Sequence, residues 1–277
     1  MSLWRPQLSG VIRLELKKTF FSRRGWWVYL LALAPVGLAL MHTLFEIRMQ
    51  GRYHRSHTIA TDGYIYATMF QLYFLRMGIF FGCVGIFSNL FRGEMLEKTL
   101  HYYFLTPLRR ELLVAGKYLS GLLVSGLLFF VSVLASFYLM GRHHGVAWSE
   151  FLRHGPGLAQ LGWYEAVAVL GCIGYGAVFL AAGMFIRNPM IPAAVMMVWE
   201  NLNPFLPGFL KKISVIFYLK SLCPVELPNP PAPLSVLMVD TDPTPAWIAV
   251  PGLLIVALAV MTYAAIAARR AEISYSE

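Results

Sequence analysis

The chain has 277 residues, of which 58% are hydrophobic and only 13% charged, and its formal net charge is +9. A soluble domain of this length carries about twice that charged fraction, and here the apolar residues form blocks near the roughly 20 residues that cross a bilayer as a helix. The blocks do not alternate as barrel strands do. The composition therefore predicts an all-α membrane protein. Because the basic residues lie mostly beside apolar blocks, orientation in a membrane explains them better than nucleic-acid binding does.

Residues 1–24 precede the first apolar block and are predicted to form a cytoplasmic amphipathic helix. The apolar residues that recur at helical spacing are Leu8, Val11, Ile12, Leu16 and Phe20. The basic residues on the other faces are Arg13, Lys17, Lys18 and Arg24. This pattern is typical of a basic helix that lies on a membrane surface, and a frayed basic tail is the alternative.

Six apolar blocks predict a domain of six transmembrane helices over residues 25–268. Their approximate bounds are 25–44, 64–91, 118–140, 163–186, 190–210 and 247–268. The fifth block is broken by Pro192, Pro204 and Pro207, which interrupt helical hydrogen bonding. Residues 211–245 form a long outer segment, and its apolar part at 213–222 is too short to cross, so a re-entrant or interfacial segment is expected there.

Lysine and arginine are distributed unequally between the two sides of these spans. The N-terminus, residues 92–117, residues 187–189 and the C-terminus carry fourteen, whereas the alternate loops carry eight. Basic residues favour the cytoplasmic side. We therefore expect both termini, including the tail 269–277, to be cytoplasmic.

The segment 92–117, RGEMLEKTLHYYFLTPLRRELLVAGK, combines mixed charge with a helical appearance. Glu94, Glu97 and Lys98 precede an apolar and aromatic stretch, Pro107 interrupts it, and Arg109 and its neighbours open the third span. A stiff helix–break–helix with charges at both ends can dock on a soluble partner and transmit its movement. The alternative is an interfacial loop whose charges only follow the positive-inside rule.

The same segment resembles the cytoplasmic loop of type-2 ABC transporter permeases. The residues that carry the resemblance are Glu94, Glu97, Lys98, Thr99, Leu100, Leu105, Thr106, Pro107, Leu108, Arg109, Arg110, Gly116 and Lys117. The layout is also similar, with an N-terminal surface helix, six spans and a long outer segment before the last span. Residues 206–224, LPGFLKKISVIFYLKSLCP, resemble the segment that these permeases carry after the fifth span.

This resemblance implies a permease subunit of an exporter in a bacterial or archaeal inner membrane, present as a dimer and bound to two ATP-hydrolysing subunits. The residues expected to couple to the ATPase are Glu94, Glu97, Lys98, Thr99, Leu105, Pro107, Arg109 and Arg110. The chain contains no G-x-x-x-x-G-K-[ST] motif, so ATP and Mg are expected on the partner subunit and no cofactor on this chain. The substrate, and whether the two permeases are identical, stay open.

Polar residues inside the predicted spans form a second candidate site. Arg76 is about 18 Å from the outer end of the second span, near the middle of a hydrocarbon core about 30 Å thick, and Glu200 is about 15 Å deep in the fifth. Gln71, Asn201 and Asn203 are nearby in sequence. Because a charge at such depth faces a partner or a wet cavity, we expect Arg76 and Glu200 to pair or to face each other along a polar route. A pair that only locks two helices together is the alternative.

No metal site is expected from the sequence. His54, His57, His143, His144 and His154 all lie on the outer side of the predicted spans, but adjacent histidines do not have a ligand spacing on one helix face. No carboxylate or cysteine cluster beside them completes a site in the sequence.

Two other classes of function are weighed against a transport subunit. A membrane-embedded enzyme needs clustered His, Asp or Glu at an interface for acid–base or metal chemistry, and the sequence shows no such cluster. A non-transporting partner of an ATPase, acting on other membrane or envelope proteins, fits the same layout.

Overall fold

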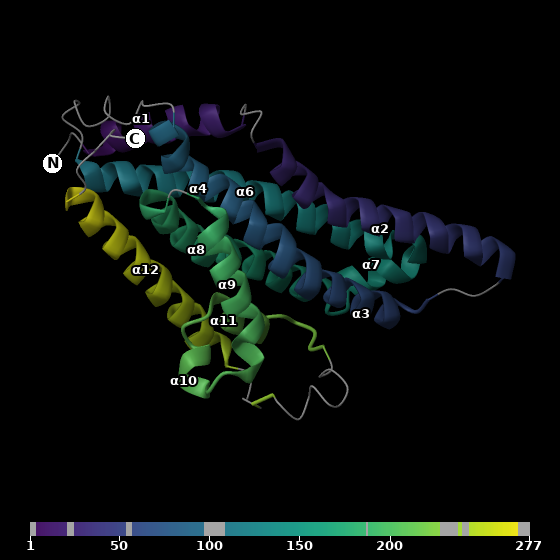
Figure 1. Ribbon diagram of the computed structural model, residues 1–277. Helices are drawn as coiled ribbons and strands as arrows, with labels where there is room; N and C mark the ends of the chain where they lie inside the picture. The colour runs from purple at the N-terminus through teal and green to yellow at the C-terminus, as the bar shows by residue number, and fades with distance from the viewer. Residues whose placement is uncertain are drawn as a thin grey trace.

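The computed structural model describes residues 4–20, 25–53, 57–96, 109–186, 188–227, 238–239 and 244–270, and this part of the chain is helical without any strand. The long helices are α2 (Trp26–Tyr53), α6 (Arg110–Gly141), α8 (Gly157–Phe185) and α12 (Ala246–Arg270), together with α3 (Ile59–Met69), the π-helix η2 (Phe70–Ile79) and α4 (Phe80–Leu96), which are joined end to end. The shorter ones are α1 (Trp4–Phe20), η3 (Arg142–His144), α7 (Val146–Arg153), α9 (Met190–Leu202), η4 (Asn203–Phe205), α10 (Gly208–Lys211) and α11 (Val215–Ser221). Figure 1 shows the long helices running alongside one another as one bundle. The helix α1 lies at the end of this bundle where α12 also ends.

Five helices of the described residues are long and apolar enough to cross a membrane. They are Trp26–Met49, Ile59–Glu94, Arg110–His144, Gly157–Phe185 and Ala246–Arg269. The prediction of an all-α, multi-pass membrane protein is therefore confirmed. The helix Ile59–Glu94 is about 54 Å long at 1.5 Å per residue, so it extends well beyond a hydrocarbon core of about 30 Å. It begins five residues earlier than predicted because the Thr58 side chain caps it, accepting a hydrogen bond from the backbone N–H of Thr61 at 3.2 Å.

The fifth predicted span is the exception, so the described residues give five helices of spanning length and not six. The block 190–210 forms α9, which has 13 residues and is about 20 Å long. Pro192 lies in its first turn, where a missing N–H is tolerated. Pro204 and Pro207 follow its end, and the chain there turns through η4 into α10. The apolar segment after it forms α11, whose buried face packs against α8 and α12.

The core of the bundle is formed by α8 and by the continuous helix α3–η2–α4. Within their most apolar stretches, 72% and 78% of the residues are buried, compared with 22–39% for the other three candidate spans. The ring of Phe87 on α4 fits between α6 and α8 because both helices present a glycine to it, Gly121 and Gly176. Small residues at such crossings let helices in a membrane approach closely. The exposed apolar faces of α2, α6 and α12 suit contact with lipid.

The closest crossing of backbones provides a test of this packing. A Cβ atom added at Gly183 on α8 would lie 2.8 Å from the backbone of Ser88 on α4, whereas no described atom lies within 4 Å of a Cβ added at Gly162 on the same helix. We expect Gly183→Ala to destabilise the protein by about 1–3 kcal/mol, as overpacking does. Gly162→Ala is expected to leave thermal unfolding of the detergent-solubilised protein unchanged or slightly improved. Equal melting temperatures of the two variants would contradict the close crossing of α4 and α8.

Candidate functional site

The two flanks of the loop 92–117 lie at one end of the bundle, where α4 ends and α6 begins, and this is termed the loop end. Glu94 is in the last turn of α4, and Arg109 and Arg110 stand at the start of α6. The remaining residues of the predicted coupling set, Glu97, Lys98, Thr99, Leu105 and Pro107, lie outside the described residues. The structure therefore places the two flanks of the loop, at Glu94 and at Arg109 and Arg110.

Lys117 on α6 is fully buried and lies between α1 and α4. Its ammonium nitrogen donates to Oε1 of Glu15 at 2.6 Å and to the carbonyl oxygen of Leu90 at 2.7 Å, and it lies 2.8 Å from Oε2 of Glu94. It is also 5.2 Å from the centroid of the Phe91 ring, within the range of a cation–π contact. A lysine ammonium has three N–H donors, and three oxygen atoms surround it here. A charge with no exposed surface is thus matched by acceptors from two other helices.

The cluster around Lys117 is balanced in charge. Glu15 and Glu94, both almost fully buried, supply two negative charges; Lys117 supplies one positive charge, and Lys18, 3.7 Å from Glu94, supplies the second. Burial raises the pKa of the Glu15 carboxyl above its ordinary value, and the neighbouring Lys117 opposes that rise. A balanced buried group of this kind persists only while its members stay together, because an unmatched buried charge is costly.

The predicted N-terminal helix is present as α1, and it is attached to the bundle through this cluster. Val11 packs against α6 at Gly116, where an added Cβ atom would lie 2.7 Å from Val11. Arg13, Lys17 and Lys18 are exposed, as the amphipathic pattern predicted. The helix therefore presents its apolar face, with Glu15 in the middle of it, to α6.

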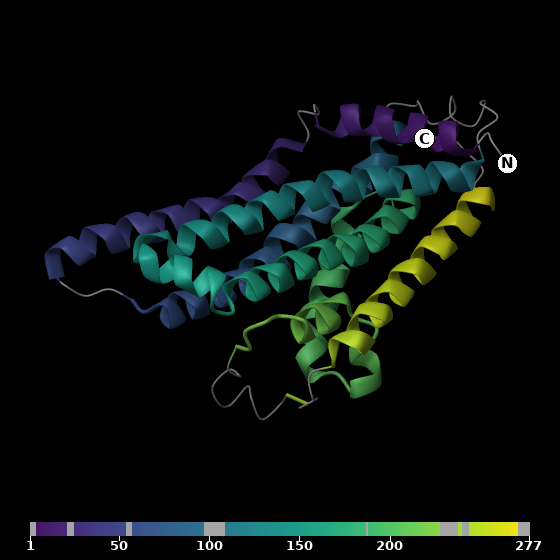
Figure 2. The same ribbon diagram turned by 180° about the vertical axis from the view of Figure 1, so that it is seen from behind.

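The start of α6 is also bound to the end of α12, and Figure 2 shows these two helix ends side by side. Arg110 donates through Nη1 to the carbonyl oxygens of Ala268 at 3.3 Å and Arg269 at 3.1 Å. Glu111 forms an ion pair with the guanidinium of Arg269. A cation on the last carbonyls of a helix is favourable because those groups lack partners inside the helix. The loop end thus joins α1, α4, α6 and α12.

Arg76 lies midway along the continuous helix α3–η2–α4, within its π-helical part. It donates through Nη1 to Oδ1 of Asn201 on α9 at 2.5 Å. Within the described part of the chain no ion pair joins Arg76 to Glu200, although both line one small cavity of about 10 Å³, room for a single water molecule. The predicted pair is therefore replaced by an arginine–amide contact, with Glu200 beside it. π-helical turns are often found at functional sites.

Glu200 instead holds the start of α11. Its carboxylate accepts hydrogen bonds from the Ser214 hydroxyl, from the backbone N–H of Val215 at 3.1 Å and from that of Ile216 at 3.0 Å. The other polar residues of the predicted route also bind backbone. Gln71 donates to the carbonyl of Val225 at 2.8 Å, and Asn203 to that of Lys211 at 3.3 Å. Three of the five residues thus secure the segment after α9.

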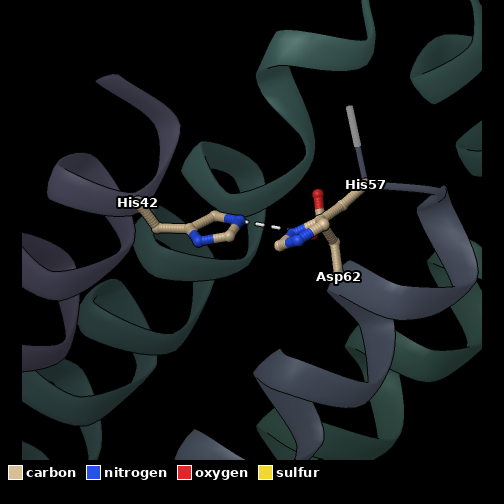
Figure 3. A group of neighbouring side chains, drawn as sticks. All are labelled: His42, His57 and Asp62. Carbon is tan, nitrogen blue, oxygen red and sulfur yellow. Dashed lines mark hydrogen bonds and ion pairs between the residues drawn. The ribbon is translucent and has the colours of Figure 1, made fainter. Parts of the chain in front are cut away.

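A second polar cluster lies at the opposite end of the bundle, termed the histidine end. Figure 3 shows His42 on α2 and His57, just before α3, directed at Asp62 on α3. Two further rings, those of His143 and His144 in η3, lie against the other oxygen of the same carboxylate. Histidine nitrogens and a carboxylate are the ligand types that hold zinc in proteins.

The sequence contained only weak signals of the residues that matter most at these two ends. Glu15 is the single acidic residue of the first 24 and falls on the apolar stripe beside Leu16, which is a signal that a buried partner was required. Asp62 and His42 gave none, because three of the four rings around Asp62 come from two distant parts of the chain, α2 and η3.

No protein-family model matches this chain, and no curated protein sequence matches it either.

Removing the Lys117 charge tests the cluster at the loop end. We expect Lys117→Met to destabilise the protein by about 3–5 kcal/mol, because it leaves the carboxylates of Glu15 and Glu94 buried without their ammonium. Adding Glu15→Gln and Glu94→Gln should restore most of the loss, measured as thermal unfolding in detergent. Lys17→Met, which removes an exposed charge from α1, is the control. Failure of the double glutamine change to rescue Lys117→Met would contradict a charge-balanced cluster.

Exchanging the charges of Arg76 and Glu200 tests the intramembrane contacts. Arginine has donors only, so an arginine at position 200 cannot accept the hydrogen bonds from Val215 and Ile216. We expect Arg76→Glu, Glu200→Arg and the double variant all to give little folded protein in fluorescence-detected size exclusion. Recovery of the double variant to the wild-type yield would show a simple ion pair instead.

Proposed function

We propose that this chain is the membrane-spanning permease subunit of an ATP-driven exporter whose ATPase is a separate polypeptide. The observation that carries the proposal is the buried Lys117, which unites both flanks of the loop 92–117 with α1. The resemblance of that loop to the coupling loop of type-2 ABC permeases supports it. A loop that receives a mechanical input must be anchored at its ends, and both described flanks of this loop are bound to neighbouring helices.

The proposed mechanism transmits movement through the contacts at the loop end. An ATPase that contacts the loop differently in its ATP-bound and empty states biases the chain between two conformations. Because Glu94 and Lys117 are in contact, α4 and α6 are displaced together, and Glu15 takes α1 with them. Arg110 extends the same connection to α12. A small displacement at the loop becomes a shift of four packed helices against their neighbours.

In this proposal the chain passes the membrane six times, with α9 as a short fifth passage. Figures 1 and 2 place the start of α1 and the end of α12 at the same end of the bundle, which an even number of passages requires. The positive-inside count assigns that end to the cytoplasm of a bacterial or archaeal cell. The segment from α10 to α11 then lies on the outer side as a re-entrant piece.

The substrate is proposed to move between two permease subunits and not through one. The cavity beside Arg76 holds about one water molecule, which is far too small for a lipid, a drug or a peptide. Arg76 and Asn201 lie at its edge on η2 and α9. Two such subunits, facing each other across these elements, would enclose a partly polar path that neither subunit contains alone.

Site-specific photo-cross-linking tests the proposal. A photoreactive amino acid at Thr106 in the loop is expected to cross-link, in native membranes, to a protein that carries a G-x-x-x-x-G-K-[ST] motif. The yield should change when ATP and Mg²⁺ are added, since the loop contacts two states of the ATPase. The same amino acid at Glu150 on α7, at the histidine end, is the control and should give no such product.

Two outcomes would overturn the assignment. Either Thr106 gives no cross-link to a nucleotide-binding protein, or Glu150 gives the same product in equal amount. Once the ATPase is known, ATP turnover of the complex in liposomes separates a transporter from a non-transporting partner of an ATPase. Turnover that a candidate substrate stimulates supports transport, and turnover that depends only on another membrane protein supports the alternative.

A further inference from the structure

The Asp62 carboxylate at the histidine end is surrounded by four imidazole rings. Its Oδ1 lies 3.2 Å from Nε2 of His42 and 3.4 Å from Nδ1 of His57. Its Oδ2 lies 3.1 Å from Nε2 of His143 and 2.9 Å from Nε2 of His144. The five residues come from the second half of α2, from the segment 57–62 that leads into α3, and from the turn η3 after α6, so the chain has to fold to assemble them.

The spacing of these atoms matches the spacing of ligands around one small cation. Zinc takes nitrogen and oxygen ligands at 2.0–2.2 Å in a tetrahedron, which places neighbouring ligand atoms about 3.3 Å apart. The ligand atoms of His42, His57 and Asp62 all lie within 4.8 Å of one another, and so do those of Asp62, His143 and His144. The rings of His42 and His143 also adjoin, with centroids 5.9 Å apart. The two groups share Asp62, which faces one group with Oδ1 and the other with Oδ2.

His143 shows that hydrogen bonding alone does not account for the cluster. Its side chain has no exposed surface, and neither ring nitrogen has a hydrogen-bond partner in the part of the chain that the structure describes. Buried polar atoms are nearly always paired. Nε2 of His143 and Oδ2 of Asp62 lie 3.1 Å apart without hydrogen-bond geometry. This is the arrangement expected of two atoms that coordinate the same metal ion.

The buried carboxylates at this end carry enough negative charge to neutralise one divalent cation. Glu46, whose side chain is 5% exposed, lies 3.4 Å from Nδ1 of His57 and accepts from the His57 backbone N–H at 3.4 Å. Asp62 and Glu46 together carry two negative charges, which balance a single dication. Glu46 faces the same ring nitrogen of His57 as Asp62 does, so it adds a second buried carboxylate directly beside the proposed site.

We propose that Asp62 and the histidines His42, His57, His143 and His144 bind one Zn²⁺ ion per chain. Imidazole ligands select zinc and similar transition-metal ions, whereas calcium and magnesium require sites built mainly of oxygen ligands. The ion fastens together the outer ends of the first three candidate spans. Asp62 is 32 residues from Glu94 along one continuous helix, about 48 Å at 1.5 Å per residue, so the ion binds at the membrane surface opposite the loop. The site rests on these residues alone and does not depend on the proposed function.

Zinc titration of the full-length protein in detergent tests the site. After removal of metals with a chelator, Zn²⁺ binding is measured by competition with a chromophoric chelator. The wild-type protein should take up one Zn²⁺ per chain, and Asp62→Asn should bind at least tenfold more weakly. The matched control is His154→Ala, which removes an exposed histidine just after α7 and should bind as the wild type does.

A second variant keeps the test decisive if Asp62→Asn does not fold. The His57 ring is 45% exposed, so His57→Ala is expected to fold and to bind Zn²⁺ at least tenfold more weakly. Co²⁺ in the wild-type site should give visible absorption stronger than that of an octahedral ion, as a four- or five-coordinate site does. The proposal is overturned if the wild type takes up no Zn²⁺, if the folded variants bind as tightly as the wild type, or if Ca²⁺ competes equally with Zn²⁺.

Discussion

The ammonium group of Lys117 is the contact on which the loop end of this protein depends. It has no access to water; it donates to Glu15 on α1 and to the carbonyl of Leu90 on α4, and it forms an ion pair with Glu94 on α4. Glu15 and Lys117 are 102 residues apart in sequence. Because a buried charge that loses its partner is strongly destabilising, none of the three helices separates from the others at low cost. The helix α1 and the two flanks of the loop 92–117 are therefore held together as one unit.

The same continuous helix carries a charged cluster at each end and one arginine between them. Glu94 belongs to the Lys117 cluster and Asp62 to the histidine cluster, at opposite ends of a helix that is longer than a hydrocarbon layer is thick. Arg76 lies between them in the π-helical part and contacts Asn201 on the short α9. In the proposed mechanism a displacement at the loop end reaches the middle of the bundle along this one continuous helix. At the far end a bound ion would fix the helix against α2 and η3, which gives the displacement a fixed point.

The sequence was sufficient for the class of fold and for most helices, because long apolar blocks are a local property. The fifth span was predicted to be too long, because the apolar block 190–210 continues past the prolines that follow the end of α9. It placed Arg76 and Glu200 at matching depths, but depth does not tell which polar atoms meet, and Glu200 found backbone donors at the start of α11. The histidine cluster around Asp62 was missed because it assembles only when the segments 42–46, 57–62 and 143–144 fold together. Tertiary packing decides such contacts, and spacing along the chain does not contain them.

Hydrogen exchange measured on the complex with the proposed ATPase subunit tests the central claim most directly. Addition of ATP and Mg²⁺ is expected to change backbone exchange at the loop 92–117 and, in the same step, in α1, at the end of α4 and at the start of α6. Lys117→Met with Glu15→Gln and Glu94→Gln should keep the response of the loop and lose that of α1. A nucleotide-dependent change confined to the loop in the wild-type protein would contradict the claim that Lys117 makes these segments move as one.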